Sequence, residues 1–257
     1  MPQGGLKIDR RRSRILQELN SEGQVWTAEL AEKLGTTEVT VRNDLKALEQ
    51  EGFLERIKGG AVKNAGSAMA DFRRRSLEMA DEKRRIAAAL AARIPNNATL
   101  MINSGSTTCY VAEALRHHRN LRIITNSLDV AGALRGALTI HVILLGGEMN
   151  SQYGFTGGGG AHEQIKNYWA DYCILSMDGV SPERGITSYY SEEVLINQTM
   201  ISRSDKTLVV ADRRKLGRES FSFVAPFSAV DLLITDSGAE ADLVRRCGEA
   251  GVETVTA

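Results

Sequence analysis

A run of hydroxyl residues around one glycine has the composition of an anion-binding turn: Ser104, Gly105, Ser106, Thr107 and Thr108. The turn follows an apolar segment, residues 99–103, and precedes residues 107–116, where apolar side chains recur at helical spacing. A strand, turn and helix in this order bring free backbone N–H groups and the positive end of a helix dipole to one point. An ordinary loop with a good helix cap is the alternative. We favour a phosphate-binding turn, because an ordinary loop rarely carries so many hydroxyls.

Polar residues or glycines also follow the other apolar segments, and the predicted site includes Asn126, Gly147, Asp178 and Lys215 among them. It also includes Asn103, at the end of the first segment. Ligands of open α/β sheets bind at the carboxyl ends of the strands, so these groups are expected to converge. Asn126 and Asp178 could bond sugar hydroxyls, and Lys215 could hold an anionic group. Each residue alone is as well explained by a turn or a cap. For the glycine run 157–160, a hinge or tight packing is favoured over a second anion site.

The elements that must position these groups alternate between strand-like and helix-like segments from Thr99 onward. Continuous apolar strands separated by helices predict an α/β fold with a parallel sheet covered on both faces. We expect this α/β domain, which contains the predicted binding site, to span residues 81–257, after a linker at residues 63–80. A helical pattern covers residues 72–93. The expected strands are residues 99–103, 121–125, 140–146, 171–177, 207–212 and 230–236.

Residues 1–62 have the pattern of a winged helix-turn-helix domain. A first helix ends at Gly23, and two further helices are joined by the turn Gly35-Thr36-Thr37. In the third helix, Val41, Leu45 and Leu48 share one face. The segment FLERIKGGAV, residues 53–62, then reads as the β-ribbon of a wing.

With the apolar face of the third helix turned inward, its polar side chains are left for DNA. Arg42 could pair with guanine and Asn43 with adenine, or either could hold phosphate. A helical hairpin for protein docking, with solvated charges, is the alternative. The turn, the wing and the basic N-terminal arm together favour DNA. The predicted DNA contacts are Arg11, Thr37, Glu38, Thr40, Arg42, Asn43, Lys46, Arg56 and Lys58.

The overall composition excludes several classes of protein. Net charge is zero, with 32 basic and 32 acidic residues, so the protein is not expected to coat nucleic acid through its overall charge. The three cysteines and four histidines show no ligand spacing, and we expect no metal and no cofactor. No apolar run is long enough to cross a bilayer, and the N-terminus lacks a secretory signal. We therefore expect a cytoplasmic protein without a membrane partner.

Across residues 10–257 the sequence resembles the DeoR family of bacterial transcriptional repressors. The most specific part is TVRNDLKALEQEG followed by GGAV, and EKRRIA, NSGSTT, TNS, LLGGE, DGVSPERGIT and ADRRKLGR follow in the family's order. The resemblance implies a sensor domain similar to ribose-5-phosphate isomerase and glucosamine-6-phosphate deaminase. It also implies a phosphorylated sugar or related metabolite as the effector, with the phosphate held by residues 104–108. Asn126, Asp178 and Lys215 would line the rest, and Glu193 matches a frequent family glutamate.

Two departures from the family pattern bear on the effector. Asn103 stands where the family usually has aspartate, which lowers the negative charge near an anion. Arg213-Arg214-Lys215 replaces the usual Ser-Ser-Lys. The two extra cations either favour a more acidic effector or are simply solvated.

These observations predict a DNA-binding regulator, a repressor of a carbohydrate-utilisation operon that a phosphorylated sugar releases from its operator. The alternative is a sugar-phosphate isomerase or deaminase, for which Asp178, Glu192 and Glu193 supply carboxylates. An enzyme has no need of the first sixty or so residues, so we expect no turnover. A homo-oligomer, dimer or tetramer, is expected, because one winged helix reads too few base pairs.

Overall fold

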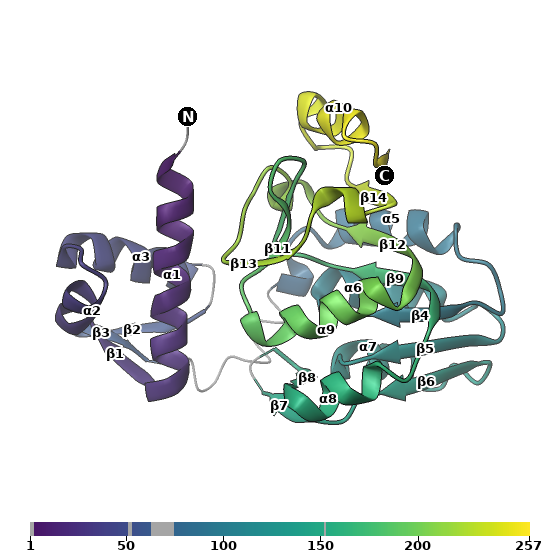
Figure 1. Cartoon of the computed structure of the whole chain (residues 1–257), viewed down its shortest axis with the longest axis horizontal. Helices are drawn as coiled ribbons and strands as arrows, with labels where there is room; N and C mark the ends of the chain where they lie inside the picture. Colours follow the sequence, from purple (N-terminus) through teal and green to yellow (C-terminus); the bar gives the residue numbers. More distant parts are fainter. Residues whose placement is uncertain (1–2, 51–52, 63–74, 152) are drawn as a thin grey trace. The chain divides into compact units, whose positions relative to one another are not determined.

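The computed structural model describes residues 3–50, 53–62, 75–151 and 153–257. The chain divides into two compact units, Met1–Arg73 and Arg74–Ala257 (Figure 1). Most of the predicted linker, residues 63–80, lies outside the described residues, and its last part, residues 75–80, belongs to the second unit. No helix among the described residues is both long and apolar enough to span a membrane.

The first unit combines three helices with a small antiparallel sheet. Leu19, Leu30, Val41, Leu45 and Leu48 form its buried centre, as the helical spacing predicts. The first helix begins before the segment in which it was predicted, residues 12–23. It ends at Glu22, and the following Gly23 has a left-handed φ of 75°. The sheet has the strand order β1-β3-β2. The elements are α1 (Gln3–Glu22), β1 (Gln24–Trp26), α2 (Thr27–Lys33), α3 (Glu38–Gln50), β2 (Glu55–Ile57) and β3 (Gly60–Val62).

Gly60 has a steric reason to be glycine. In the β1–β3 pair it lies opposite Trp26, and a Cβ atom at this position would lie 2.1 Å from the carbonyl oxygen of Val25. No side chain fits there without moving the backbone. The glycine pair of the predicted wing is thus what allows β3 to lie between β1 and β2.

The second unit is built on a seven-stranded sheet in the order β15-β14-β12-β9-β4-β5-β6. Every neighbouring pair in it is parallel, which confirms the predicted parallel sheet. The strands are β4 (Thr99–Ile102), β5 (Leu121–Thr125), β6 (Ile140–Leu144), β9 (Ala170–Leu175), β12 (Ser204–Val210), β14 (Leu232–Thr235) and β15 (Glu253–Thr256).

Two apolar cores lie on opposite faces of this sheet. Alternate residues of one strand enter different cores, as Met101 and Ile102 of β4 do. Side chains of α5 (Ala80–Ala91), α6 (Ser106–Leu115) and α7 (Leu128–Ala133) join one core. Those of α8 (Gly158–Ile165), α9 (Ser191–Ser202) and α10 (Ala241–Glu249) join the other (Figure 1). The sheet is therefore covered on both faces, as predicted.

Several local features were not predicted or differ from prediction. The helical pattern of residues 72–93 is interrupted, because Met79 is left-handed with φ 57° and α5 begins after it. The edge strand β15 was not expected. Neither were the short strands and 3₁₀ turns between the main elements: β7 (Glu148–Asn150), β8 (Phe155–Gly157), β10 (Gly179–Ser181), β11 (Gly185–Ser188), β13 (Ser222–Ala225), η1 (Arg213–Lys215) and η2 (Phe227–Ala229).

Candidate functional site

The Ser104–Thr108 turn joins the carboxyl end of β4 to the first turn of α6. Gly105 has extended backbone, and a Cβ atom here would lie 2.8 Å from the Cβ atom of Ser176, so close approach requires the glycine. Thr108 is fully buried, and its hydroxyl donates to the carbonyl oxygens of Asn103 and Gly105, both at 3.0 Å. Thr108 therefore holds the turn in shape. Ser104 and Ser106 are partly exposed, beside the unsatisfied N–H groups that begin a helix.

Asn103 holds two strands together. Its Nδ2 donates to the Ser176 carbonyl at 3.0 Å, and its Oδ1 accepts from the Ser176 N–H at 2.9 Å. The side chain is 1% exposed and thus continues the β4–β9 ladder beyond the strands. A carboxylate here would keep the accepted bond but lose the donated one. The amide of Asn103 is thus committed to the Ser176 backbone, a partner that the sequence did not indicate.

Glu193 lies at the centre of the predicted site. It sits in the first turn of α9 and is 5% exposed. Ser104 Oγ donates to its Oε1 at 2.6 Å, and Asn126 Nδ2 donates to the same oxygen at 3.4 Å. Burial raises the pKa of Glu193 to about 7, although these hydrogen bonds act in the opposite direction. The Asn126 Oδ1 is buried and has no hydrogen-bond partner among the described residues.

We expect Glu193→Gln to change how stability depends on pH. The folded pKa of about 7 lies above the ordinary value of 4.5, so the cost of ionising Glu193 sets in as pH rises between them. At pH 8 the glutamine variant avoids this cost, which is up to roughly 3 kcal/mol, whereas at pH 5 most of the advantage disappears. Urea unfolding of both proteins at the two pH values measures the difference in their free energies of unfolding. Glu192→Gln, at the exposed neighbour, is the control, and an advantage for Glu193→Gln that does not vary with pH would contradict the prediction.

Asp178 and Lys215 face each other at two further strand ends. Lys215 Nζ lies 3.4 Å from Asp178 Oδ1, and the Tyr189 N–H donates to Asp178 Oδ2 at 3.0 Å. Burial raises the pKa of Asp178, but Lys215, the Tyr189 N–H and Arg75 outweigh it and hold the pKa below its ordinary value. Asp178 in turn helps to raise the pKa of Glu193, so the two carboxylates share one electrostatic environment.

The structure thus brings most of the predicted site residues together. We call this group the strand-end cluster: the Ser104–Thr108 turn, Asn126, Asp178, Glu193 and Lys215. Gly147 is not included in this group. A Cβ atom on Gly147 would lie 2.4 Å from the carbonyl oxygen of Gly157, so tight packing explains it. The glycine run serves this packing, and its residues 158–160 form the first turn of α8.

Arg213 and Arg214 both have carboxylate partners that the sequence did not indicate. Arg213 pairs with buried Asp236 at 2.7 Å, and Arg214 pairs with buried Asp212 at 2.9 Å. Arg214 also reaches Glu78 at 3.0 Å. Both cations are therefore paired with carboxylates of the protein, so neither is simply solvated.

In the first unit, the polar face of α3 is exposed as predicted. Thr37 caps the helix, since its hydroxyl accepts from the Thr40 N–H at 3.2 Å. Arg42 pairs with Glu38 one turn earlier, and both side chains are about half exposed. A surface pair of this kind contributes less than about 1 kcal/mol and is easily exchanged for another partner. Asn43 and Lys46 are exposed on the same helix, and Lys58 is exposed on the wing.

Two further predicted DNA contacts also have partners within the protein, and one exposed residue was missed. Arg11 pairs with Asp44, which is buried in α3, so Arg11 fastens α1 to that helix. The Arg56 side chain lies 3.8 Å from a carboxylate oxygen of Glu49, and the Arg56 backbone N–H donates to the same carboxylate group at 3.0 Å. Val39, which is 63% exposed near the start of α3, was overlooked because it lies off the buried stripe. An apolar side chain there suits contact with a thymine methyl group.

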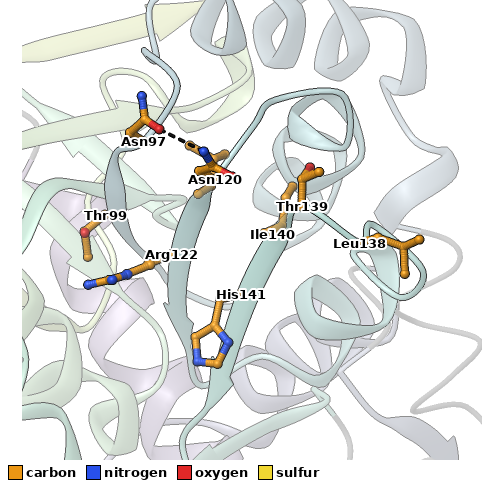
Figure 2. A pocket seen from close by; sticks show the side chains of 9 residues that line it. Asn97, Thr99, Asn120, Arg122, Leu138, Thr139, Ile140 and His141 are labelled. Atoms are coloured by element: carbon orange, nitrogen blue, oxygen red, sulfur yellow. Dashed lines mark hydrogen bonds between the residues drawn. The ribbon is translucent and has the colours of Figure 1, made fainter.

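A separate cavity of about 670 Å³ lies at the opposite, amino ends of the strands. Figure 2 shows Arg122 and His141 on neighbouring strands, and Asn120 donating to Asn97 Oδ1 at 3.1 Å. The cavity begins where β4, β5 and β6 begin, so it is distinct from the strand-end cluster. No group of histidine, cysteine, aspartate or glutamate side chains in the described part of the chain could hold a metal ion.

Comparison with known proteins matches both units to family models. Residues 11–66 match a DeoR-like helix-turn-helix domain, and residues 78–237 match a DeoR C-terminal sensor domain. The glycerol-3-phosphate regulon repressor of Escherichia coli strain K12 is 33% identical over 90% of this chain and 92% of its own. A helix-turn-helix repressor of the same strain, CsqR, is 30% identical over 95% of this chain and 94% of its own. Among solved structures, ribose 5-phosphate isomerase A from Neisseria gonorrhoeae covers 52% of each chain, with 19% identity and a TM-score of 0.39.

Proposed function

The chain belongs to the DeoR family of transcriptional repressors, and from this premise we propose that a phosphorylated sugar binds the strand-end cluster and releases the protein from its operator. The operator DNA is bound by the exposed face of α3 and by the wing. The controlled genes belong to carbohydrate utilisation. The protein acts as a homo-oligomer, so that paired winged helices read two half-sites.

The observation that carries this proposal is the composition of the strand-end cluster. Backbone N–H groups at the start of α6, the Ser104 and Ser106 hydroxyls and the Lys215 ammonium suit a phosphate group. Asn126 and Asp178 offer donors and acceptors for sugar hydroxyls. The unpartnered, buried Oδ1 of Asn126 favours a ligand that supplies a hydrogen-bond donor.

Turnover is not part of the proposed function, although Glu193, with its raised pKa of about 7, has the property of a general acid or base. The relatives that match this chain over most of its length are named as regulators. A coupled isomerase assay with a panel of sugar phosphates tests this part, and robust turnover would overturn it.

Thermal unfolding of the full chain with a panel of phosphorylated sugars tests the proposed effector class. A ligand present at a hundred times its Kd stabilises a protein by about 2.7 kcal/mol, so a true effector is expected to raise the unfolding temperature by several degrees. The matching unphosphorylated sugars serve as controls and should not stabilise the protein. Stabilisation by the free sugars alone would contradict a phosphate-binding site.

A further inference from the structure

One hydrogen-bonding group of Arg75 lacks a partner in the part of the chain that the structure describes. It is the first described residue of the second unit, and its guanidinium carbon lies 5.3 Å from the ring centre of Tyr153. Its Nε is buried and has no hydrogen-bond partner among the described residues. Leaving a cationic N–H group buried and unpaired is costly. This favours a partner that comes from outside the chain.

The charge of Arg75 acts on the strand-end cluster. Arg75 is among the groups that lower the pKa of Asp178 and of Glu193, and it acts in the same direction on nearby Asp129. Tyr153, on which the guanidinium stacks, packs against Tyr190 with ring centres 4.2 Å apart, and Tyr190 directly precedes α9. Arg75 therefore faces the same group of polar side chains as Lys215, from the side of the chain that leads to the DNA-binding unit.

The backbone around Arg75 is fastened to α5 and to α6, of which α6 carries part of the cluster. Lys83, a buried lysine of α5, donates to the carbonyl oxygens of Arg75 and Glu78. Tyr110 of α6 donates to the carbonyl oxygen of Ser76 at 3.0 Å. Because the Glu78 carboxylate also pairs with Arg214, residues 75–78 are held by α5, by α6 and by the loop that contains Lys215.

Burial lowers the pKa of Lys83 to about 8, and the nearby Asp212 acts in the opposite direction. A lysine so deeply buried is retained where its hydrogen bonds serve a purpose, here the two carbonyl groups of the segment that contains Arg75. The path from the DNA-binding unit into the sensor domain is thus anchored by a specific buried group.

We propose that Arg75 binds the anionic group of the effector and thereby couples the strand-end cluster to the segment that leads to the DNA-binding unit. This inference rests on the proposed function. An effector shifts an equilibrium only by contacts that differ between two states. A side chain on the connecting segment can supply such a contact, because a bound anion would engage Arg75 together with the strand-end cluster.

The test compares the full-length wild type with Arg75→Gln, Arg75→Lys and Arg84→Gln. Arg84 is the matched control, because it also stacks on a tyrosine, at 5.5 Å from the Tyr110 ring centre, but is exposed and pairs with Asp81. The probes are inorganic phosphate and glycerol 3-phosphate. For each protein, probe affinity is measured by thermal unfolding, and affinity for the DNA upstream of its own operon is measured with and without probe.

We expect Arg75→Gln to bind both probes about tenfold more weakly or worse, as loss of a charged hydrogen bond implies. Its DNA affinity without probe should stay within about threefold of wild type, and the effect of the probe on DNA affinity should disappear. Arg75→Lys should retain part of both effects, and Arg84→Gln should match wild type.

The possible failures can be told apart. If Arg75→Gln binds the probes with wild-type affinity, the role of Arg75 is overturned and the proposed effector site stands. If neither wild type nor Arg84→Gln binds either probe, the anion-binding site itself is wrong, and the inference is overturned with it.

Discussion

Replacing Arg42 with alanine is expected to weaken operator binding by about 10- to 100-fold without unfolding the protein. The side chain is 57% exposed on α3, and its pairing with Glu38 across one helical turn stabilises the fold only slightly. A bidentate contact between arginine and guanine contributes about 1–3 kcal/mol of discrimination, which the alanine variant would lose. Fluorescence anisotropy with labelled DNA from upstream of its own operon measures the change.

The same titration distinguishes two roles for Arg42. If it reads a base, the variant loses discrimination between operator and unrelated DNA. If it holds a phosphate, affinity falls evenly for all sequences, and the salt dependence decreases by about one counterion. Arg84→Ala, an exposed arginine of the sensor domain that pairs with Asp81, is the control. Unchanged operator binding by Arg42→Ala would count against α3 as the recognition helix.

Replacing Gly105 with alanine is expected to yield a protein that binds its operator but no longer responds to the effector. The new Cβ atom would lie 2.8 Å from the Ser176 Cβ and 3.1 Å from the Thr108 Oγ1, so the Ser104–Thr108 turn must shift. Displacing the N–H groups that would bind the proposed phosphate is expected to cost affinity on the order of 100-fold, because charged hydrogen bonds are worth about 1.5–3 kcal/mol each.

Calorimetric titration with the sugar phosphate found by thermal unfolding measures this loss. Gly132→Ala is the matched control, because a Cβ atom there meets nothing within 4 Å. The control should bind the effector as wild type does. Wild-type effector affinity in Gly105→Ala would mean that the Ser104–Thr108 turn is not the phosphate-binding element.

Much of the fold could be predicted, because the spacing of apolar residues along the sequence indicates which side chains are buried. The stripe of Val41, Leu45 and Leu48 defines the inner face of α3, and continuous apolar strands can only be buried on both sides. The position of the candidate site could also be predicted, because the carboxyl ends of parallel strands meet at one edge of the sheet. The break at Met79 carries no signal of this kind, because methionine ordinarily favours a helix.

The side-chain partners could not be predicted, because they depend on residues far apart in the chain. Arg213 lies 23 residues from its partner Asp236, so its neutralisation is invisible in the sequence. Asn103 lies at a strand end, where a ligand-binding side chain is expected. Its amide instead bonds the Ser176 backbone, a contact that depends on the pairing of β4 with β9 and cannot be seen in the sequence. Arg75 lies within the predicted linker and the predicted helix, where a charged side chain is expected to be exposed to solvent.

Operator affinity with and without a phosphorylated sugar is the most direct test of the proposed mechanism. We predict that the sugar phosphate that stabilises the full chain also weakens its binding to operator DNA by at least tenfold. A shift from almost fully bound to almost fully released needs a preference on the order of 5 kcal/mol for the state that binds DNA weakly. A panel in which stabilising sugar phosphates leave operator affinity unchanged would contradict release by this effector class.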